Sequence, residues 1–404
     1  MKKIKTVFCI LLCAAMLSVN VTAEKTVSSE CDISDLLVPV DSTVTDFAVG
    51  SVLELKAKSA ILMEVKTGKI LYDMNSSEKM PPASITKIMS LLLVMEAIDR
   101  GELKLEDVIV ASEHACSMGG SQIWLEPGES MTVDELLKAT VIASANDATV
   151  ALGEKIAGSE EGFVHLMNER AKQLGMNSTT FVNATGLDAK GHESSAHDVA
   201  VMSAELIKYP LIKKYSTVWM DTLRDGKSEL VNTNKLVRFY PGTTGLKTGT
   251  TSGAGYCLSA TAERDGMELV AVVMKGDTSQ ERFNAAKKLL DFGFANYTYK
   301  KITADIEGNS WLPIAKGVEK SVKIVPKGDF SVILKKSEAK SVTQKINLKE
   351  KVTAPVKKGD VLGNVDIYID DEQIGSIDLV AESNIEKLNF KTALWWIIKG
   401  FFTL

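Results

Sequence analysis

The sequence predicts an α/β domain of the α+β type, an antiparallel sheet flanked by helices, followed by a small all-β domain and a C-terminal amphipathic helix. Two observations lead to this fold class. Apolar residues alternate with a period of two on both sides of a long stretch in which they recur every three or four residues. After about residue 297 the chain changes to β-branched runs separated by glycine turns. This order of elements describes one sheet with helices packed against it.

Residues 1–23 are predicted to be a signal peptide, and residues 24–50 a polar linker. Lys2, Lys3 and Lys5 precede a short apolar run, and Val21-Thr22-Ala23 offers a small-residue cleavage site. An uncleaved membrane anchor is the alternative reading of this segment. In either case we expect an exported protein, located at the outer face of the cytoplasmic membrane.

Composition excludes several classes of protein. The chain has 47 basic and 52 acidic residues, a net charge of −5, which argues against nucleic acid as a partner. Outside the signal peptide only Cys31, Cys116 and Cys257 remain, an odd set that forms no disulfide framework. The sequence contains no HExxH or CxxC motif and no glycine-rich phosphate loop, so we expect neither a metal nor a cofactor.

The first domain is predicted to span residues 51–296, and its elements follow from periodicity. Alternation around Lys66-Thr67-Gly68 indicates a hairpin over residues 59–73. Helical spacing begins at Ser84, after Pro81-Pro82. Further elements are predicted as helices at residues 132–157 and 160–174, strands at 254–263 and 267–274 joined by Arg264-Asp265-Gly266, and a closing helix at 282–292.

Residues 297–382 are predicted to form the small all-β domain, and residues 383–404 the amphipathic helix. Its longest uncharged stretch is much shorter than the ~20 residues needed to cross a bilayer. Trp395-Trp396 flanked by Lys387, Lys391 and Lys399 is typical of a helix that lies in the membrane interface. A core helix of the preceding domain is the alternative.

Three short motifs carry the chemistry, and their order along the chain matters more than any one of them. Each motif also has decoys, which order, spacing and local context separate from the functional set: Ser76-Ser77-Glu78-Lys79, Ser337-Glu338-Ala339-Lys340, Ser18-Val19-Asn20 and Lys66-Thr67-Gly68. The ordered set has the form S-x-x-K, S-x-N and K-T-G. It reads Ser84-Ile85-Thr86-Lys87, Ser144-Ala145-Asn146 and Lys247-Thr248-Gly249.

A serine hydroxyl becomes a useful nucleophile only when a neighbouring base takes its proton. Ser84 and Lys87 are three residues apart, so on a helix they share a face. Lys87 can act as the base only when neutral, and burial together with the positive charge of Lys247 would lower its pKa. The non-catalytic alternatives are that Ser84 caps the helix and that Lys87 is a solvated surface lysine.

The other two motifs supply binding groups. Ser144 and Asn146 stand among small apolar residues, which indicates a tight turn between helices facing a cleft; helix capping is the alternative. The segment from Lys247 to Thr250 reads as an edge strand, along which a peptide could add as a further strand. Gly249 would permit close approach, and Lys247 and the threonine hydroxyls could hold a carboxylate.

With these motifs, the chain resembles the low-molecular-mass penicillin-binding proteins of the D-alanyl-D-alanine carboxypeptidase family. Supporting strings are Asn183-Ala184-Thr185-Gly186-Leu187-Asp188, Ser194-Ser195-Ala196-His197-Asp198, and Arg282 ahead of Lys287-Lys288-Leu289-Leu290. The resemblance implies a penicillin-binding/β-lactamase-like transpeptidase domain, a β-rich C-terminal domain and a C-terminal anchor.

The resemblance also implies roles for individual residues. Ser84 would be acylated, with Lys87 as its general base and Ser144 assisting proton transfer. The backbone N–H groups of Ser84 and Thr250 would form the oxyanion hole. Substrate binding would fall to Asn146, Lys247, Thr248, Gly249, Thr250 and Arg282. Relatives often carry His where this chain has Thr250, which bears on specificity.

The implied activity is removal of the terminal D-alanine from peptidoglycan pentapeptides, with inhibition by β-lactams. Expected partners are stem peptides ending in D-Ala-D-Ala, β-lactam antibiotics and, through the C-terminal helix, the membrane surface. Two alternatives remain open: a β-lactamase, and a β-lactam sensor or wall-binding protein without turnover. No acidic residue ahead of Lys247 stands out as the water-activating group that a β-lactamase needs.

Overall fold

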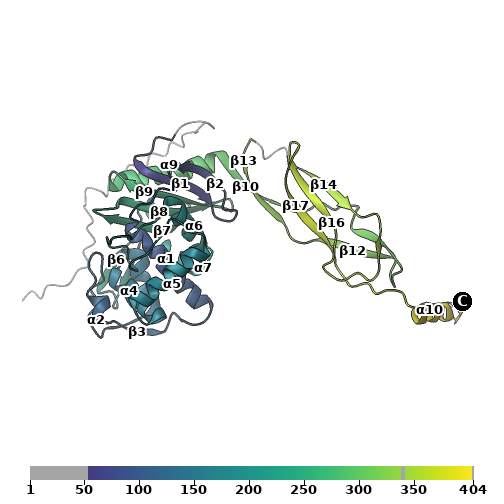
Figure 1. Cartoon of the computed structure of the whole chain (residues 1–404), viewed down its shortest axis with the longest axis horizontal. Coiled ribbons are helices and arrows are strands. Elements are labelled where there is room, and N and C mark those ends of the chain that lie inside the picture. The colour runs from purple at the N-terminus through teal and green to yellow at the C-terminus, as the bar shows by residue number, and fades with distance from the viewer. Residues whose placement is uncertain (1–52, 338–341, 403–404) are drawn as a thin grey trace, which may run out of the picture.

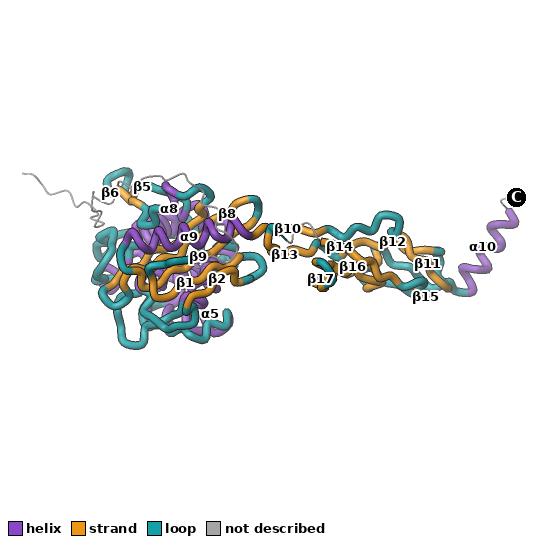
Figure 2. Tube along the Cα trace, turned by 90° about the horizontal axis from the view of Figure 1, so that it is seen from above, coloured by secondary structure: helices purple, strands orange, loops and turns teal. Residues whose placement is uncertain are grey.

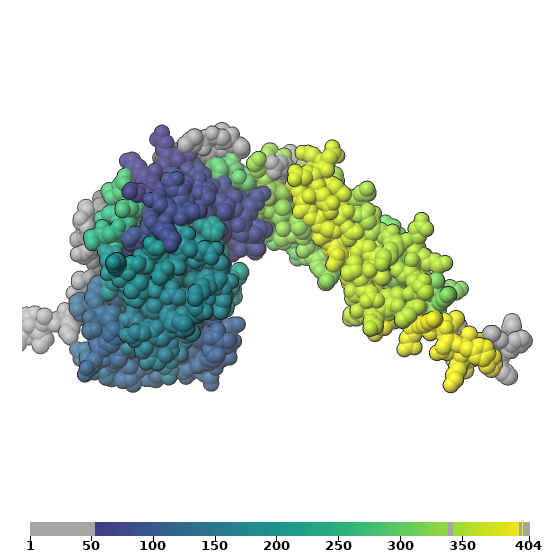
Figure 3. Space-filling model, in the orientation of Figure 1, coloured from purple at the N-terminus to yellow at the C-terminus, as the bar shows by residue number. Residues whose placement is uncertain are grey.

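The computed structural model describes residues 53–337 and 342–402. The predicted signal peptide, the predicted linker and Cys31 lie outside these residues. Figure 1 shows two lobes: a larger lobe of sheet and helices, and an elongated β-rich lobe that ends in helix α10 (Phe390–Phe402). The space-filling view in Figure 3 shows α10 standing out at the far end of the β-rich lobe.

The larger lobe is built on a five-stranded antiparallel sheet with the strand order β2-β1-β9-β8-β7. Both predicted hairpins are present in this sheet, and the KTG strand, β7, lies at its edge as expected. The bounds are Ala57–Glu64 for β1, Ile70–Met74 for β2, Thr243–Thr251 for β7, Gly255–Arg264 for β8 and Met267–Gly276 for β9.

The central strand β9 is apolar from Leu269 to Met274 because both faces of the sheet are covered there. Val270, Val272 and Met274 belong to the core on one face, whereas Leu269 and Val273 belong to the core on the other. Successive side chains of a strand point to opposite faces, so a strand between two cores must be apolar at every position. Helix α9 (Ser279–Asn296) runs along the second face (Figure 2).

The first face is covered by the helices that carry most of the motif residues. They are the 3₁₀ turn η2 (Ala83–Thr86), α1 (Lys87–Asp99), α2 (Glu113–Cys116), α3 (Val133–Lys138), the π-helical segment η3 (Ala139–Ala143), α4 (Asn146–Ala157), α5 (Glu160–Gln173), α6 (Ala196–Leu206) and α7 (Pro210–Ser216). Helix α8 (Leu236–Phe239) instead places Leu236 in the core of the second face. Two small two-stranded sheets were not predicted: β3 (Val108–Val110) with β4 (Ser130–Thr132), and β5 (Met220–Leu223) with β6 (Ser228–Val231).

Two predicted helices differ from the structure. The helix predicted from Ser84 begins as a 3₁₀ turn and becomes α-helical only at Lys87, since 3₁₀ turns are common where helices begin. The helical stretch predicted over residues 132–157 starts with Thr132 in β4 and is interrupted at Ser144. That residue has the left-handed values φ 63° and ψ 28°, which no α-helix accommodates.

The β-rich lobe consists of a two-stranded ribbon and a six-stranded sheet in the order β14-β16-β17-β12-β11-β15. The ribbon pairs β10 (Tyr297–Ile302) with β13 (Phe330–Lys335) and follows α9 directly. At this junction the Lys66 ammonium lies 4.3 Å from the centre of the Tyr299 ring. The remaining bounds are Trp311–Ala315 for β11, Ser321–Pro326 for β12, Val342–Leu348 for β14, Val352–Thr353 for β15, Val361–Ile369 for β16 and Glu372–Ala381 for β17.

The C-terminal helix starts later than predicted. Residues 383–389 do not belong to it, because Ile385 is buried in the core of the β-rich lobe and pairs with Val356. Within α10 itself, Leu394, Trp395 and Ile398 are exposed. In the part of the chain that the structure describes, no helix combines the length and apolar character needed to cross a membrane.

Helix α9 owes its close fit on the sheet to Gly293. A Cβ atom added there would lie 2.5 Å from Leu269 Cδ1 and 2.8 Å from Leu62 Cδ2. We therefore expect Gly293→Ala to lower the free energy of unfolding by about 1–3 kcal/mol through overpacking. Urea unfolding followed by circular dichroism measures this, with Lys287→Ala on the same helix as the control. A neutral or stabilising Gly293→Ala would show that helix propensity prevails over packing.

Candidate active site

Ser84 and Lys87 meet at the start of α1. Lys87 Nζ donates hydrogen bonds to Ser84 Oγ at 3.0 Å and to the Thr185 carbonyl at 2.9 Å. Ser84 remains partly exposed, whereas the Lys87 side chain is fully buried. The Ser84 hydroxyl is therefore open to a ligand on one side and in contact with a buried amine on the other.

Burial lowers the pKa of Lys87 well below its ordinary value, because the charged ammonium is stripped of water. The positive charge of Lys247 lowers the Lys87 pKa further, and the carboxylate of Asp147 raises it. The net result favours the neutral amine that the sequence required of a base. A neutral amine at hydrogen-bond distance from a serine hydroxyl can accept its proton.

Lys247 is also fully buried, and it lies near enough to affect Lys87. Burial, with a contribution from the positive charge of Arg282, lowers the pKa of Lys247 to about 7. Within the described residues Lys247 Nζ has no hydrogen-bond partner. Its three N–H donors therefore remain available to an acceptor brought by a ligand.

Ser144 and Asn146 occupy the sharp turn between η3 and α4, as the sequence predicted. Both are buried, and neither Ser144 Oγ nor Asn146 Oδ1 finds a hydrogen-bond partner among the residues described. Asn146 Nδ2 donates to the Gly119 carbonyl at 2.5 Å, and Asn146 N donates to the Ser121 carbonyl at 2.7 Å. The segment 119–125 is thereby fixed against the turn.

Asp147 holds this segment and was missed in the sequence. Its fully buried carboxylate accepts hydrogen bonds from the backbone N–H groups of Ile123 and Leu125, at 3.0–3.2 Å, and of Ala148 at 2.9 Å. A carboxylate in so apolar a run was the available signal, because buried charges need several hydrogen bonds. Its contact with segment 119–125 has no sequence signal.

Strand β7 passes directly beside the Ser84 turn. A Cβ atom at Gly249 would lie 2.9 Å from Ser84 N and 3.0 Å from Ile85 N. Glycine is therefore required here for contact with the protein's own backbone, whereas the sequence suggested only the approach of a substrate. Thr248 Oγ1 donates to Thr233 Oγ1 at 2.8 Å, and Thr250 is exposed at the end of the site.

Arg282 reaches β7 from α9. Its Nη1 donates to the Gly249 carbonyl at 3.1 Å, to Thr250 Oγ1 at 2.9 Å and to the Cys257 carbonyl at 3.3 Å. The side chain is buried, with 8% of its surface exposed. The guanidinium thus lies behind Thr250, orients its hydroxyl and adds positive charge to this end of the site.

The loop of residues 182–192 covers the other side of the Ser84 turn. A Cβ atom at Gly186 would lie 1.9 Å from the Ala83 carbonyl oxygen, so only glycine fits. His192 Nδ1 accepts from Val182 N at 3.0 Å, which leaves the proton on Nε2, 2.8 Å from Thr86 Oγ1. Burial lowers the pKa of His192 to about 4, so this histidine is neutral. Its two hydrogen bonds connect the loop to Thr86 in the Ser84 turn.

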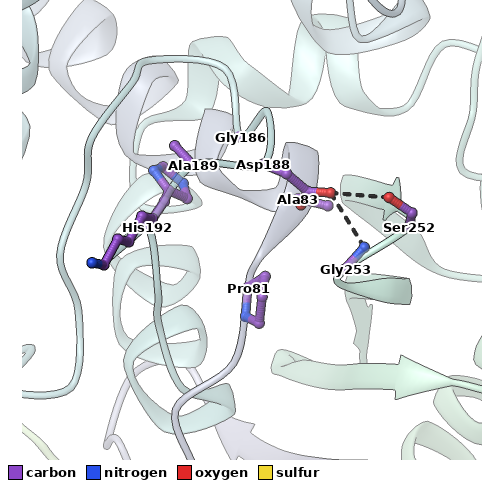
Figure 4. A pocket seen from close by; sticks show the side chains of 9 residues that line it. Pro81, Ala83, Gly186, Asp188, Ala189, His192, Ser252 and Gly253 are labelled. Carbon is purple, nitrogen blue, oxygen red and sulfur yellow. Dashed lines mark hydrogen bonds between the residues drawn. The ribbon is translucent and has the colours of Figure 1, made fainter.

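A pocket of about 530 Å³ lies between this loop and the turn that follows β7. Figure 4 shows the residues that line it. Pro81, Ala83, Gly186 and His192 line one side, and Ser252 and Gly253 the other. Asp188 joins the two sides through hydrogen bonds to Ser252 and Gly253 (Figure 4). Sequence reasoning assigned no role to Asp188 or His192, because their partners are distant in sequence.

The structure brings Ser84, Lys87, Arg282 and the Lys247–Thr250 segment of β7 together, with Ser144 and Asn146 on the turn beside Asp147, whose charge acts on Lys87. Two decoys lie elsewhere, and the motif at Ser337 extends beyond the described residues. Lys66 lies in the β1–β2 turn and donates to the Gly266 carbonyl, and buried Ser76 donates to Asp73. Among the described residues, no three His, Cys, Asp or Glu side chains gather in a way that could hold a metal ion.

Comparison with known proteins places this geometry in a family. The family model described as D-alanyl-D-alanine carboxypeptidase matches residues 45–278, and that of the penicillin-binding protein 5 C-terminal domain matches residues 297–387. The D-alanyl-D-alanine carboxypeptidase DacF of Bacillus subtilis (strain 168) is 45% identical over 348 residues, which cover 85% of this chain and 90% of the relative.

Two solved structures are similar. Penicillin-binding protein 5 from Haemophilus influenzae is 31% identical, with a TM-score of 0.72 over 83% of this chain and 99% of its own. Penicillin-binding protein D2 from Listeria monocytogenes, in its ampicillin-bound form, is 34% identical, with a TM-score of 0.56 over 60% and 100%. The chain therefore belongs to the D-alanyl-D-alanine carboxypeptidase family of serine peptidases, as the order of its three motifs indicated.

Proposed function

We propose that this protein removes the terminal D-alanine from peptidoglycan pentapeptides through an acyl-enzyme on Ser84, and that β-lactams inhibit it by acylating the same serine. One observation carries the proposal: a buried lysine with a depressed pKa lies 3.0 Å from a partly exposed serine hydroxyl. Family membership supplies the substrate class, and the ampicillin-bound relative supports the inhibitor class.

Acylation begins when neutral Lys87 accepts the Ser84 proton and Ser84 Oγ attacks the carbonyl carbon between the two D-alanines. The oxygen of the tetrahedral intermediate faces the backbone N–H groups of Ser84 and Thr250. Ser144 Oγ, with no competing hydrogen bond among the described residues, gives its proton to the leaving amine and regains one from the Lys87 ammonium. Water then cleaves the ester, which returns Ser84 and releases the shortened peptide.

The substrate lies along the edge strand β7, where Asn146 and the strand offer hydrogen bonds to its backbone. Its terminal carboxylate is held by the Thr250 hydroxyl, and by that of Thr248 once its proton turns from Thr233, with the positive charges of Lys247 and Arg282 behind them. Because Arg282 already donates to three oxygens, its main contributions are charge and the orientation of Thr250. Gly249 permits the strand to lie against the Ser84 turn.

The chain acts outside the cytoplasm, on cell-wall substrate, and helix α10 attaches it to the membrane surface as a peripheral anchor. Exposed Leu394, Trp395 and Ile398 supply the apolar side chains, and Lys391 is exposed on the same helix. An exposed aromatic and aliphatic cluster with basic neighbours suits the headgroup region of an anionic membrane.

The proposed function predicts a single acylated serine. The wild type should release D-alanine from a D-Ala-D-Ala peptide, and penicillin should add its mass to Ser84 alone. Peptide mapping of the adduct, with Ser84→Ala as the inactive variant and Ser76→Ala as the control, tests both points. Label on another serine would overturn the site assignment, and rapid hydrolysis of penicillin would favour a β-lactamase.

Lys247 should set the pH dependence of acylation through its charge. Since that charge lowers the Lys87 pKa, Lys247→Met should raise it and move the rising limb of kcat/KM to higher pH, while Lys247→Arg should leave the limb in place. A neutral thioester substrate avoids the effect of carboxylate binding. An unshifted limb in Lys247→Met would mean that burial alone depresses the Lys87 pKa.

Helix α10, the proposed anchor, should be removable without damage to the β-rich lobe, because the helix begins at Phe390, after the last buried residue of that lobe, Ile385. Deleting residues 390–404 should release a soluble enzyme whose rate on a short peptide is unchanged. Deleting residues 383–404 also removes buried Ile385, so this longer deletion should destabilise the lobe by about 2–5 kcal/mol. Fractionation and thermal unfolding distinguish the two forms. Membrane association of the shorter deletion would place the anchor elsewhere in the chain.

A further inference from the structure

We propose that Asp188 is a positioning residue that fixes the distance between the two halves of the catalytic site. One half carries Ser84 and Lys87, and the other is the end of β7 with Thr250. This role rests on the proposed function, because it concerns where the two oxyanion donors stand during acylation. Its basis is a three-point hydrogen-bonded contact that joins two loops across the site.

The Asp188 carboxylate organises the turn after β7. It accepts hydrogen bonds from Thr251 Oγ1 at 2.6 Å, from Ser252 Oγ at 3.3 Å and from Gly253 N at 3.2 Å. Thr251 Oγ1 accepts in turn from Ala254 N at 3.0 Å. The hydrogen bond from Thr251, foremost among these, lowers the Asp188 pKa, so the carboxylate is ionised at neutral pH.

The loop that carries Asp188 is fixed on the nucleophile side. Gly186, with φ +89°, lies so close to Ala83 that an added Cβ would be 2.9 Å from Ser84 N. Asn183 Oδ1 accepts from Gly186 N at 2.7 Å and from Thr185 N at 3.2 Å. The Thr185 carbonyl accepts from Lys87. Any displacement of this loop would therefore move groups that contact both the nucleophile and its base.

The far end of β7 depends on such a link. Strand β7 touches the Ser84 turn at Gly249, whereas Thr250 is exposed, pairs with Tyr256 of β8 and is held by Arg282 from the α9 side. Neither of these contacts comes from the nucleophile side, and Asp188 supplies one there, one residue beyond Thr250. An oxyanion hole with one donor from each half works only when their separation is constant, since an error of about 1 Å can cost 10²-fold in rate.

A purely structural role does not account for this contact. Asp188 is exposed. The three groups that donate hydrogen bonds to its carboxylate belong to the turn after β7, and none of them is part of a hydrophobic core. Exposed polar contacts of this kind contribute little to folding stability. Loss of the carboxylate should therefore leave the fold intact and appear in the rate of the chemical step.

The test compares Asp188→Ala and Thr251→Val, singly and together, on a D-Ala-D-Ala peptide and on a neutral thioester. Each single variant should lose about 10- to 100-fold in kcat with KM little changed, and equally on both substrates, because the oxyanion forms on each. The double variant should be no slower than Asp188→Ala, because both substitutions break one contact. Thermal unfolding should match the wild type.

Asp360→Ala is the matched control, since Asp360 also holds a turn, accepting from Lys357 N at 2.7 Å in the β-rich lobe. It should retain full activity. Asp188→Ala within twofold of wild type, a loss confined to KM or to the carboxylate substrate, or additive losses in the double variant would overturn the positioning role. If Asp188→Ala fails to fold, Thr251→Val alone decides by the same criteria. A wild type that neither releases D-alanine nor binds penicillin would refute the proposed function itself.

Discussion

The burial of two lysine side chains beside each other is the constraint on which the rest of the structure depends. Lys87 and Lys247 are both fully buried, and the loss of water around each ammonium group lowers its pKa. Two ammonium groups in such a place would repel, so the arrangement favours one neutral amine next to Ser84. The Thr185 carbonyl accepts a hydrogen bond from the Lys87 amine, and the negative charge of Asp147 limits how far the Lys87 pKa falls.

Water must be excluded from both lysines while the Ser84 hydroxyl stays accessible, which requires close backbone packing around Ser84. The fold solves this by pressing backbone against backbone: Gly186 against Ala83, and Gly249 against the Ser84 turn. Behind them, a sheet covered on both faces leaves little freedom for β7 to shift. Segment 119–125 is fixed along the remaining side, because Asn146 donates a hydrogen bond to the Gly119 carbonyl and Asp147 accepts one from Leu125 N.

The sequence was sufficient for the sheet hairpins, the edge position of β7 and the three motifs, because each depends on local periodicity or residue type. The sequence was insufficient where a contact with a residue distant along the chain determines the local structure or the role of a side chain. Ser144 breaks a helical pattern because α4 is held by segment 119–125, and Ile385 leaves the predicted helix because the β-rich core takes its side chain. Asp188 and His192 gained roles only when the fold brought their partners close.

The two glycines beside the nucleophile also limit how this enzyme could evolve resistance to its inhibitors. Any side chain at Gly186 or Gly249 would collide with the backbone that presents Ser84, so natural variation at both positions is closed to a functional enzyme. Thr250 and the exposed turn at Ser252 face solvent and have room to change. Selection for discrimination between drug and peptide would therefore act on the rim of the site, and the nucleophile's immediate surroundings would stay unchanged.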